Sequence, residues 1–213
     1  MADNQLECSG QLSRAGMRRR RILESARKLF VERGFHATGV AQIARESGVA
    51  VGQMYRDFAS KEDIVAALVA EDCAAFLRAE MLASAISDGD SGSAMTWLLA
   101  LLEPSDDPGT AGLFAEIVAE SARNKRIAAI FASLQLELRS TVMEALAQIA
   151  PDPKLDDARS LLADTLLTLS LGLLHNQLLN PAADTRLLSK TMQQILKERV
   201  IAMATAGQKE VAA

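Results

Sequence analysis

The chain has 213 residues, of which 49% are hydrophobic and 4% aromatic, so it can bury a sizeable core and lacks the composition of a disordered protein. Residues 1–63 hold 11 Lys+Arg and 8 Asp+Glu (net +3), whereas the remaining 150 residues hold 12 and 19 (net −7). A basic end on an acidic body indicates that only the first part of the chain faces a polyanion.

Cysteine use and hydropathy predict the compartment. Cys8 and Cys73 form no motif with each other or with histidine, which favours a reducing environment. The polar N-terminus has no apolar core segment of a signal peptide. The longest nearly apolar run, residues 166–174, is shorter than the roughly 18 residues that span a bilayer. We therefore expect a soluble, cytoplasmic protein with no membrane partner.

The chain begins with a polar stretch, residues 1–12, that we expect to be a disordered arm. Four consecutive arginines, residues 18–21, then lead into a helix that ends at Gly34, a residue able to take the left-handed cap conformation. This helix has one apolar stripe, formed by Ile22, Ala26, Leu29 and Phe30. The cap would bring Phe35 against Phe30.

Two short helices follow. Thr38 can cap the first with its hydroxyl, and Gly48 ends it. The second covers residues 50–58, with Met54 and Phe58 on its inner face. Two short helices joined by a glycine turn are typical of a helix-turn-helix, which places its second helix in the DNA major groove.

Ser60 caps a long helix, and the remaining breaks are set by Gly, Asn and Pro residues. Further helices are predicted over residues 61–86 and about 94–103, 110–123, 125–149, 154–179 and 184–205. We find no convincing strand pattern, so we predict an all-α fold of about nine helices. The predicted domains are the arm 1–12, a helix-turn-helix domain 13–60, a helical body 61–206, and a tail 207–213.

The outer face of the second short helix has the residue types needed to read DNA. Gly52 permits close approach, Gln53 and Arg56 offer hydrogen-bond donors, and Tyr55 can reach a phosphate oxygen or a thymine methyl. Lys61, like Thr38, stands at a helix start, where backbone N–H groups can help hold a phosphate. The arginine run could also grip phosphate, or it could be a solvated face.

The stretch FHATGVAQIARESGVAVGQMYRDFASK, residues 35–61, resembles the N-terminal signature of the TetR family of bacterial transcriptional regulators in its glycine, aromatic and lysine spacing. Three positions depart from the usual pattern: Gly39 and Ala50 replace hydroxyl residues, and Asp57 stands where Tyr, His or Asn is common. Asp57 could pair with a nearby arginine.

The resemblance implies a homodimer that places one such helix per subunit in successive major grooves of a palindromic operator. It implies phosphate contacts from Tyr55 and Lys61, and base contacts from Val51, Gln53 and Arg56. It also implies a repressor that a small, largely apolar ligand releases, with no cofactor or metal. The alternatives are a helical small-molecule binding protein or enzyme, which the missing catalytic motifs oppose, and an effector-independent DNA-binding protein.

The resemblance gives the body two roles, dimerisation and ligand binding. The last two helices are the dimer candidates, and a small-residue stripe of Thr165, Thr168 and Gly172 would allow close approach. The predicted interface consists of Leu162, Leu166, Leu169, Leu173, Leu188, Met192 and Ile195. Packing within one chain is the alternative explanation for the same leucines.

Aromatic residues from different body helices could line an apolar pocket. The candidates are Phe76, Trp97, Phe114, Phe131 and His175, and ordinary core packing is the alternative for each. Asp164, Thr168 and His175 share a helix face and could orient a ligand, or they could form a polar patch at the dimer interface.

Overall fold

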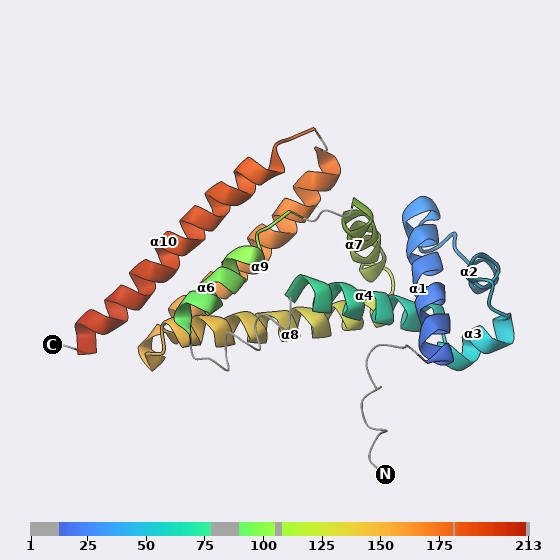
Figure 1. The fold of residues 1–213 in the computed structure, drawn as a ribbon, viewed down its shortest axis with the longest axis horizontal. Helices are drawn as coiled ribbons and strands as arrows, with labels where there is room; N and C mark the ends of the chain where they lie inside the picture. Colours follow the sequence, from blue (N-terminus) through green and yellow to red (C-terminus); the bar gives the residue numbers. More distant parts are fainter. Residues whose placement is uncertain (1–12, 78–89, 105–107, 181, 212–213) are drawn as a thin grey trace, which may run out of the picture. The chain divides into compact units, whose positions relative to one another are not determined.

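The computed structural model describes residues 13–77, 90–104, 108–180 and 182–211, without the side chains of residues 73, 75–77, 108, 110 and 207–211. These described residues form nine α-helices and one short 3-10 helix, which confirms the all-α prediction (Figure 1). The chain divides into two compact units, Met1–Leu68 and Val69–Ala213, so the division falls inside α4 (Lys61–Leu77). The predicted arm over residues 1–12 lies outside the described residues, and the predicted functional boundary at residue 60 stays a prediction.

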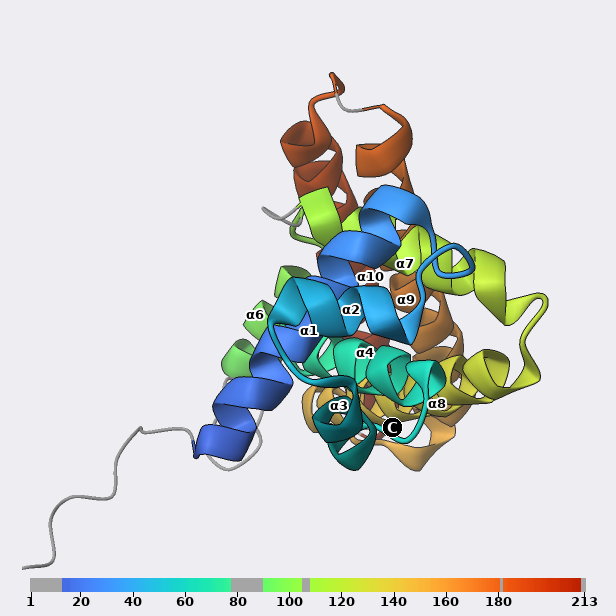
Figure 2. The same cartoon turned by 90° about the vertical axis from the view of Figure 1, so that its right-hand side faces the viewer.

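The first unit consists of three helices and the start of α4, seen from a second side in Figure 2. The three are α1 (Arg14–Arg33), α2 (Val40–Ser47) and α3 (Val51–Asp57). The predicted apolar stripe of α1 is buried, and α1 ends at Gly34, whose φ of 83° lies in the region that favours glycine. The ring centroid of Phe35 is 5.4 Å from that of Phe30, which confirms the predicted contact after the cap.

The turn between α2 and α3 depends on a second glycine. Gly48 has φ 66° and ψ 23°, the left-handed conformation that ends α2, and the next N–H, of Val49, donates to the carbonyl of Ala44 at 3.0 Å. The Val49 side chain is buried below the turn, as are Ile43 of α2 and Met54 of α3. These contacts fix the change of direction between the two short helices.

The second unit is built from five further α-helices and the end of α4. They are α6 (Ser91–Ala100), α7 (Pro108–Ser121), α8 (Lys125–Ile149), α9 (Asp156–Leu179) and α10 (Thr185–Val211), with the 3-10 helix η1 (Pro153–Leu155) before α9. The last two helices, α9 and α10, lie side by side and run in opposite directions from a short connection (Figure 1).

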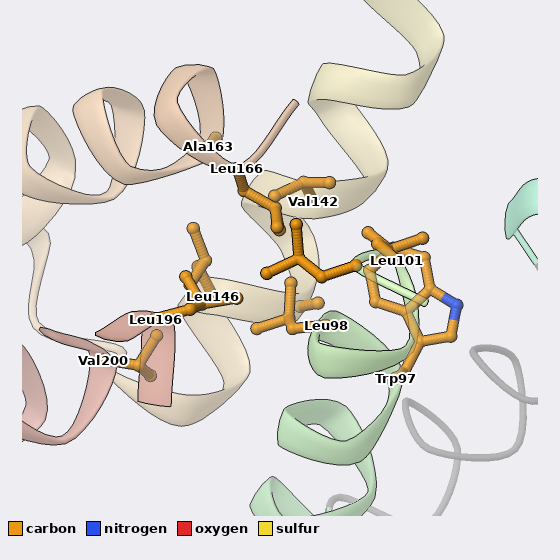
Figure 3. Close-up of a cluster of buried hydrophobic side chains, with 11 residues drawn as sticks. Trp97, Leu98, Leu101, Val142, Leu146, Ala163, Leu166, Leu196 and Val200 are labelled. Carbon is orange, nitrogen blue, oxygen red and sulfur yellow. The ribbon is translucent and has the colours of Figure 1, made fainter. Parts of the chain in front are cut away.

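Four helices of this unit share one apolar core, in which side chains from α6, α8, α9 and α10 point toward one another (Figure 3). Its largest member is Trp97, which is 1% exposed. The other labelled members are Leu98, Leu101, Val142, Leu146, Ala163, Leu166, Leu196 and Val200. Each large side chain buried here contributes about 1.5–3 kcal/mol, so this core holds the four helices together.

Side chains of α9 and α10 also close the carboxyl end of α6, whose last carbonyls have no partner within the helix. The hydrogen bonds run from Ser170 Oγ to the Leu101 oxygen (3.0 Å), from Ser189 Oγ to the Leu102 oxygen (2.6 Å) and from Gln193 Nε2 to the Leu99 oxygen (3.0 Å). These bonds set the register of α6 against the last two helices.

Several helix boundaries differ from the predicted ones. The helix α6 begins at Ser91, three residues before the predicted start, because the Asp90 carboxylate accepts hydrogen bonds from the N–H groups of Gly92 and Ser93. The helix α10 continues to Val211, so the predicted end near residue 205 is wrong. No described helix combines the length and the apolar character needed to cross a membrane.

Candidate nucleic-acid interface

The helix α3 has two faces of opposite character. Its inner residues Met54 and Phe58 are buried in the first unit, as predicted. Its outer face is exposed and is formed by Val51, Gly52, Gln53, Tyr55 and Arg56. The structure therefore brings these five predicted DNA-reading residues to one surface.

Gly52 on this surface is not required by the fold. A Cβ atom built there would meet no atom within 4 Å, and the residue has no positive φ. Any need for glycine at this position must therefore come from a molecule that approaches α3 from outside.

The amino end of α3 has no side-chain cap. Its N-cap residue is Ala50, which makes no side-chain hydrogen bond, as expected for a residue that lacks the hydroxyl common in the related pattern. The seven residues of α3 also fall far short of the roughly 12–15 residues that an isolated helix needs for marginal stability. Contacts with the rest of the unit must therefore hold α3 in place.

The carboxyl end of α3 is held by two arginines of α1. Arg18 donates from Nε and Nη2 to the two carboxylate oxygens of Asp57, at 2.5 and 2.8 Å. Arg19 donates to the Asp57 carbonyl at 2.7 Å, and its guanidinium carbon lies 4.3 Å from the ring centroid of Phe58. The predicted pairing of Asp57 with a nearby arginine is confirmed.

This geometry sets the charge at the end of α3. The hydrogen bonds from Arg18 lower the pKa of Asp57 below its ordinary value of 3.8, although partial burial opposes that shift. The same bonds raise the pKa of Arg18. Asp57 is therefore an ionised and compensated carboxylate at neutral pH.

The arginine run has mixed roles. Arg18 and Arg19 face α3, whereas Arg20 pairs with Glu24 one turn along the exposed side of α1, with 3.0 Å between Nε and Oε1. The run is therefore neither a uniform phosphate arm nor a uniform solvated face.

Lys61 at the start of α4 lies against the connection between α1 and α2. Its ammonium donates to the carbonyls of Phe35 and Thr38, at 2.6 and 3.0 Å, and lies 3.9 Å from the centroid of the Phe35 ring. Ser60 caps α4 as predicted, because its Oγ accepts from the Asp63 N–H at 3.2 Å. Lys61 thus fastens the first unit in addition to any phosphate contact.

Thr38 does not have its predicted place at the start of α2. The N-cap residue is Gly39, and the Thr38 hydroxyl instead donates to the carbonyls of Leu29 and Gly34. Thr38 is fully buried, so the capping prediction is wrong, and a direct phosphate contact would require the side chain to leave the core. The sequence gave no sign of this, because a threonine at the N-cap and a threonine one residue before it have the same sequence pattern around them.

The predicted ligand residues separate in space. Phe114 of α7 has its ring centroid 5.5 Å from that of Phe131 of α8 and 6.0 Å from that of His175 of α9. Trp97 belongs to the four-helix core, which supports ordinary core packing, the alternative stated for it, and the Phe76 side chain lies outside the described residues. The structure thus brings together three of the five candidates, all partly buried.

The polar stripe of α9 does not act as one group. The Asp164 carboxylate accepts from Arg139 of α8, with 2.7 Å between Oδ1 and Nε, and the Thr168 hydroxyl donates to the Asp164 carbonyl. Only His175 lies beside the aromatic pair, and its Nδ1 is 3.1 Å from the Leu171 carbonyl oxygen. Among the described residues, no three His, Cys, Asp or Glu side chains are grouped to hold a metal ion.

The predicted dimer leucines divide in the same way. Leu166 and Leu173 are buried within the subunit, and Leu162, Leu169 and Met192 pack partly against its core, so these residues support the single-chain alternative. Leu188 and Ile195 are exposed. The predicted small-residue stripe is exposed too, and it continues into two leucines that the sequence reasoning missed, Leu161 and Leu179.

Comparison with known proteins agrees with this architecture. Residues 22–68 match the model of bacterial regulatory proteins of the tetR family, and residues 93–204, just over half of the chain, match the C-terminal domain of BetI-type transcriptional repressors.

Individual proteins are similar over much of the chain. The HTH-type transcriptional regulator UidR of Escherichia coli K12 is 28% identical over 142 residues, 63% of this chain and 70% of UidR. The structure of Salmonella enterica GusR has a TM-score of 0.66 at 21% identity, covering 90% of this chain and 99% of GusR. A TetR-family transcriptional regulator from Streptomyces coelicolor has a TM-score of 0.67 at 24% identity, covering 88% of this chain and 96% of its own.

The two matched regions coincide with the helix-turn-helix unit and with the helical body just described. Together they cover every described helix except the first turns of α1, the first two residues of α6, and the ends of α4 and α10. The chain belongs to the TetR family of bacterial transcriptional regulators and carries a BetI-type C-terminal domain.

Proposed function

We propose that this regulator is a homodimeric repressor that binds a palindromic operator through α3 and is released by a small, largely apolar ligand. The observation that carries the proposal is the division of α3 into a face buried by Met54 and Phe58 and an exposed face around Gln53. A helix of seven residues is roughly 10 Å long, which suits a major groove about 12 Å wide.

Within this interface, Val51 and Gln53 are the proposed base contacts and Tyr55 is the proposed phosphate contact, with Arg56 able to serve either role. Gln53 can make a bidentate pair with adenine, and the Val51 side chain can touch a thymine methyl. Lys61 stays a proposed phosphate contact in addition to its hydrogen bonds within the unit. The buried Thr38 side chain is not among the proposed contacts.

The dimer is proposed to form through exposed residues of α9 and α10, revised from the sequence prediction. On α9 the surface consists of Leu161, Thr165, Thr168, Gly172 and Leu179, and on α10 of Leu188, Thr191 and Ile195. These residues recur every three, four or seven positions and so form one stripe on each helix. Gly172 has nothing within 4 Å of a built Cβ atom, which leaves room for a partner helix.

The effector is proposed to bind beside Phe114, Phe131 and His175. The two aromatic rings provide an apolar surface, which favours a ligand that is largely apolar. Because a carbonyl oxygen can only accept, His175 Nδ1 is the donor in its bond to Leu171, and in the tautomer with a single proton on Nδ1 the other nitrogen, Nε2, is an acceptor. The ligand class that fits is a small apolar molecule with one hydroxyl or N–H donor.

Release would follow from linkage between the two units. The helix α4 has its first eight residues in the first unit and its last nine in the second, so ligand binding can bias its position. A change in the separation of the two reading helices from the 34–36 Å repeat of DNA would lower operator affinity. The decrease cannot exceed the differential affinity of the ligand for the two conformations.

The DNA-binding proposal is tested by selecting duplexes from a random pool with purified protein and measuring gel shifts at moderate salt. We expect enrichment of an inverted repeat, bound more tightly than a scrambled duplex of equal length, with two chains per repeat by light scattering. Failure to enrich any sequence would sink the proposal. Steep salt dependence with equal affinity for all duplexes would favour effector-independent binding instead.

The ligand site is tested with the fluorescent probe 1-anilinonaphthalene-8-sulfonate, which reports accessible apolar sites. We expect the wild-type protein to bind it and Phe131→Ala to bind it more weakly, whereas Leu136→Ala, on an exposed position of the same helix, should bind as the wild type does. Equal binding by Phe131→Ala would move the proposed site elsewhere.

A further inference from the structure

The carboxyl end of α3 and the first turns of α1 form a compact set of contacts, here called the arginine clamp, made by Arg18, Arg19, Asp57 and Phe58. It combines a two-point ion pair, a hydrogen bond to the last carbonyl of the helix, and a guanidinium over an aromatic ring. The Asp57 side chain is only 9% exposed and that of Arg18 26%, so the pair is shielded from solvent on most sides.

The clamp supplies what α3 otherwise lacks. The other described contacts of α3 with the unit are largely apolar, through Met54 and the Phe58 ring, and apolar contacts are non-directional. At the amino end, Ala50 provides no side-chain cap. The planar guanidinium group of Arg18, by contrast, can donate both hydrogen bonds only to a carboxylate in a narrow range of orientations. The clamp is therefore the directional contact that fixes how α3 is turned.

The charge of Asp57 is a second reason to expect a role for its pair with Arg18. A carboxylate at a helix carboxyl end meets the negative pole of the helix, and one beside a DNA-reading surface also repels phosphate. Asp57 is next to Arg56 of the reading face and would be unfavourable on both counts if it were uncompensated. Pairing with Arg18 removes both penalties.

We infer that Arg18 and Asp57 are positioning residues for sequence reading: their ion pair sets the orientation of α3 so that Val51 and Gln53 meet the base edges. Neither side chain needs to touch DNA. The inference rests on the proposed DNA-binding function, and it assigns a role to Asp57, one of the three residues at which this chain departs from the usual family pattern.

The direction in which DNA affinity changes when the Asp57 charge is removed distinguishes a positioning role from a simple effect of net charge. Removing an acid next to DNA should tighten binding if only net charge matters. Removing the same acid should weaken operator binding if it positions α3. Asp57→Asn therefore gives opposite results under the two explanations, because asparagine keeps the shape but loses the charge and one acceptor.

The experiment uses the full-length chain and two probes, the duplex selected by the wild-type protein and a scrambled duplex of the same length. The variants are Asp57→Asn, Arg18→Gln and the exchange Arg18→Asp with Asp57→Arg. The matched control is Arg20→Gln, which removes the same charge from an exposed position two residues away. Dissociation constants at several salt concentrations and thermal melting are measured for each.

We expect Asp57→Asn and Arg18→Gln to weaken binding of the selected duplex about tenfold or more, with scrambled-duplex binding and the salt slope close to those of the wild type. Arg20→Gln should change both duplexes in parallel, and the exchange should recover part of the lost discrimination. If Asp57→Asn is unfolded at the assay temperature, Arg18→Lys, which keeps the charge but loses the fork, is held to the same expectation.

Equal or tighter binding of the selected duplex by folded Asp57→Asn overturns the inference. So does a parallel loss on both duplexes by Arg18→Gln with the salt slope reduced by about one, because Arg18 would then be a phosphate contact. If the wild-type protein selects no duplex at all, the proposed function fails, which is a separate outcome from equal binding by wild type and variants.

Discussion

The ammonium of Lys61 lies 3.9 Å from the centroid of the Phe35 ring, and it also donates a 2.6 Å hydrogen bond to the Phe35 carbonyl. A residue at the start of α4 is thereby tied to the connection between α1 and α2. The lysine that the family resemblance assigns to phosphate is part of the unit's internal structure as well.

Lys61→Ala should therefore destabilise the protein even without DNA. Losing the charged hydrogen bonds and the contact with the ring should cost about 1–3 kcal/mol of unfolding free energy. Urea unfolding measures this, with Arg56→Ala as an exposed control that should stay within about 0.5 kcal/mol of the wild type. Unchanged stability together with a salt slope lower by about one would show that Lys61 serves phosphate alone.

Gly48, which ends α2, and Gly52, in the first turn of α3, give a second, paired prediction. Neither has an atom within 4 Å of a built Cβ, but Gly48 has φ 66° and Gly52 has an ordinary helical backbone. Gly48→Ala should cost about 1–2 kcal/mol of unfolding free energy because of the left-handed conformation. Gly52→Ala should stabilise the free protein by up to about 1 kcal/mol.

On DNA, the added methyl group at position 52 should obstruct the approach of α3 to the groove, so Gly52→Ala is expected to lose operator affinity while gaining stability. Thermal melting and gel shifts with the selected duplex measure the two quantities. Operator binding at the wild-type level by Gly52→Ala would contradict the close approach of this residue to DNA.

How far the sequence predicts the molecule depends on the range of the contacts. The helix-turn-helix is encoded locally: Gly34 and Gly48 each end a helix, and Phe35 contacts Phe30 five residues earlier, so spacing alone placed α1 to α3. In the body, α9 carries leucines on nearly every side, and period alone cannot say which of them face α8. Leu166 therefore went to the dimer surface in the prediction and lies in the core in the structure.

The predictions for Thr38 and Trp97 differ from the structure for a related reason. A threonine before a short helix is a good cap by local rules, but the Thr38 hydroxyl is buried and donates to the carbonyls of Leu29 and Gly34 at the end of α1. Trp97 had the right chemistry for a pocket, and only the three-dimensional arrangement of α6 shows that it fills the core. Local rules identify the reading helix better than they identify the ligand site.

The pH dependence of stability follows from two acids of the first unit. Hydrogen bonds from Arg18 lower the pKa of Asp57 below 3.8, and a hydrogen bond from Lys28 lowers the pKa of Glu46 below 4.5. A lowered pKa means that the stabilisation is present above the ordinary value and is lost as pH falls through the lower folded-state value. The melting temperature should therefore decrease as the pH is lowered: the contribution of the Glu46 ion pair is lost below pH 4.5 and that of the Asp57 ion pair below pH 3.8.

Thermal melting from neutral pH to about pH 2.5 checks this. Asp57→Asn and Glu46→Gln should each melt below the wild type at neutral pH, and each difference should shrink in acid as the native carboxylate becomes protonated. A difference from the wild type that stays constant across the whole range would assign the effect to packing rather than to the ion pairs.

The proposed dimer can be tested with two isoleucines of α10 that are nearly equally exposed, Ile195 at 52% and Ile201 at 50%. They are six residues apart and so point about a third of a turn away from each other. Only Ile195 lies on the stripe with Leu188 and Thr191 that the proposed interface uses. Ile195→Glu should convert the dimer to monomers at micromolar concentration, because it buries a charge without a partner, whereas Ile201→Glu should leave it intact.

Light scattering measures the oligomeric state, and gel shifts measure its consequence. A monomer can occupy only one half-site, so Ile195→Glu should lose most of its affinity for the inverted repeat yet keep the weak affinity for an isolated half-site, since effective concentration no longer assists the second contact. Dissociation by Ile201→Glu instead would move the interface to the other side of α10. An intact dimer in both variants would show that α10 lies outside the interface. The proposed interface would then depend on Leu161 and Gly172 of α9 alone.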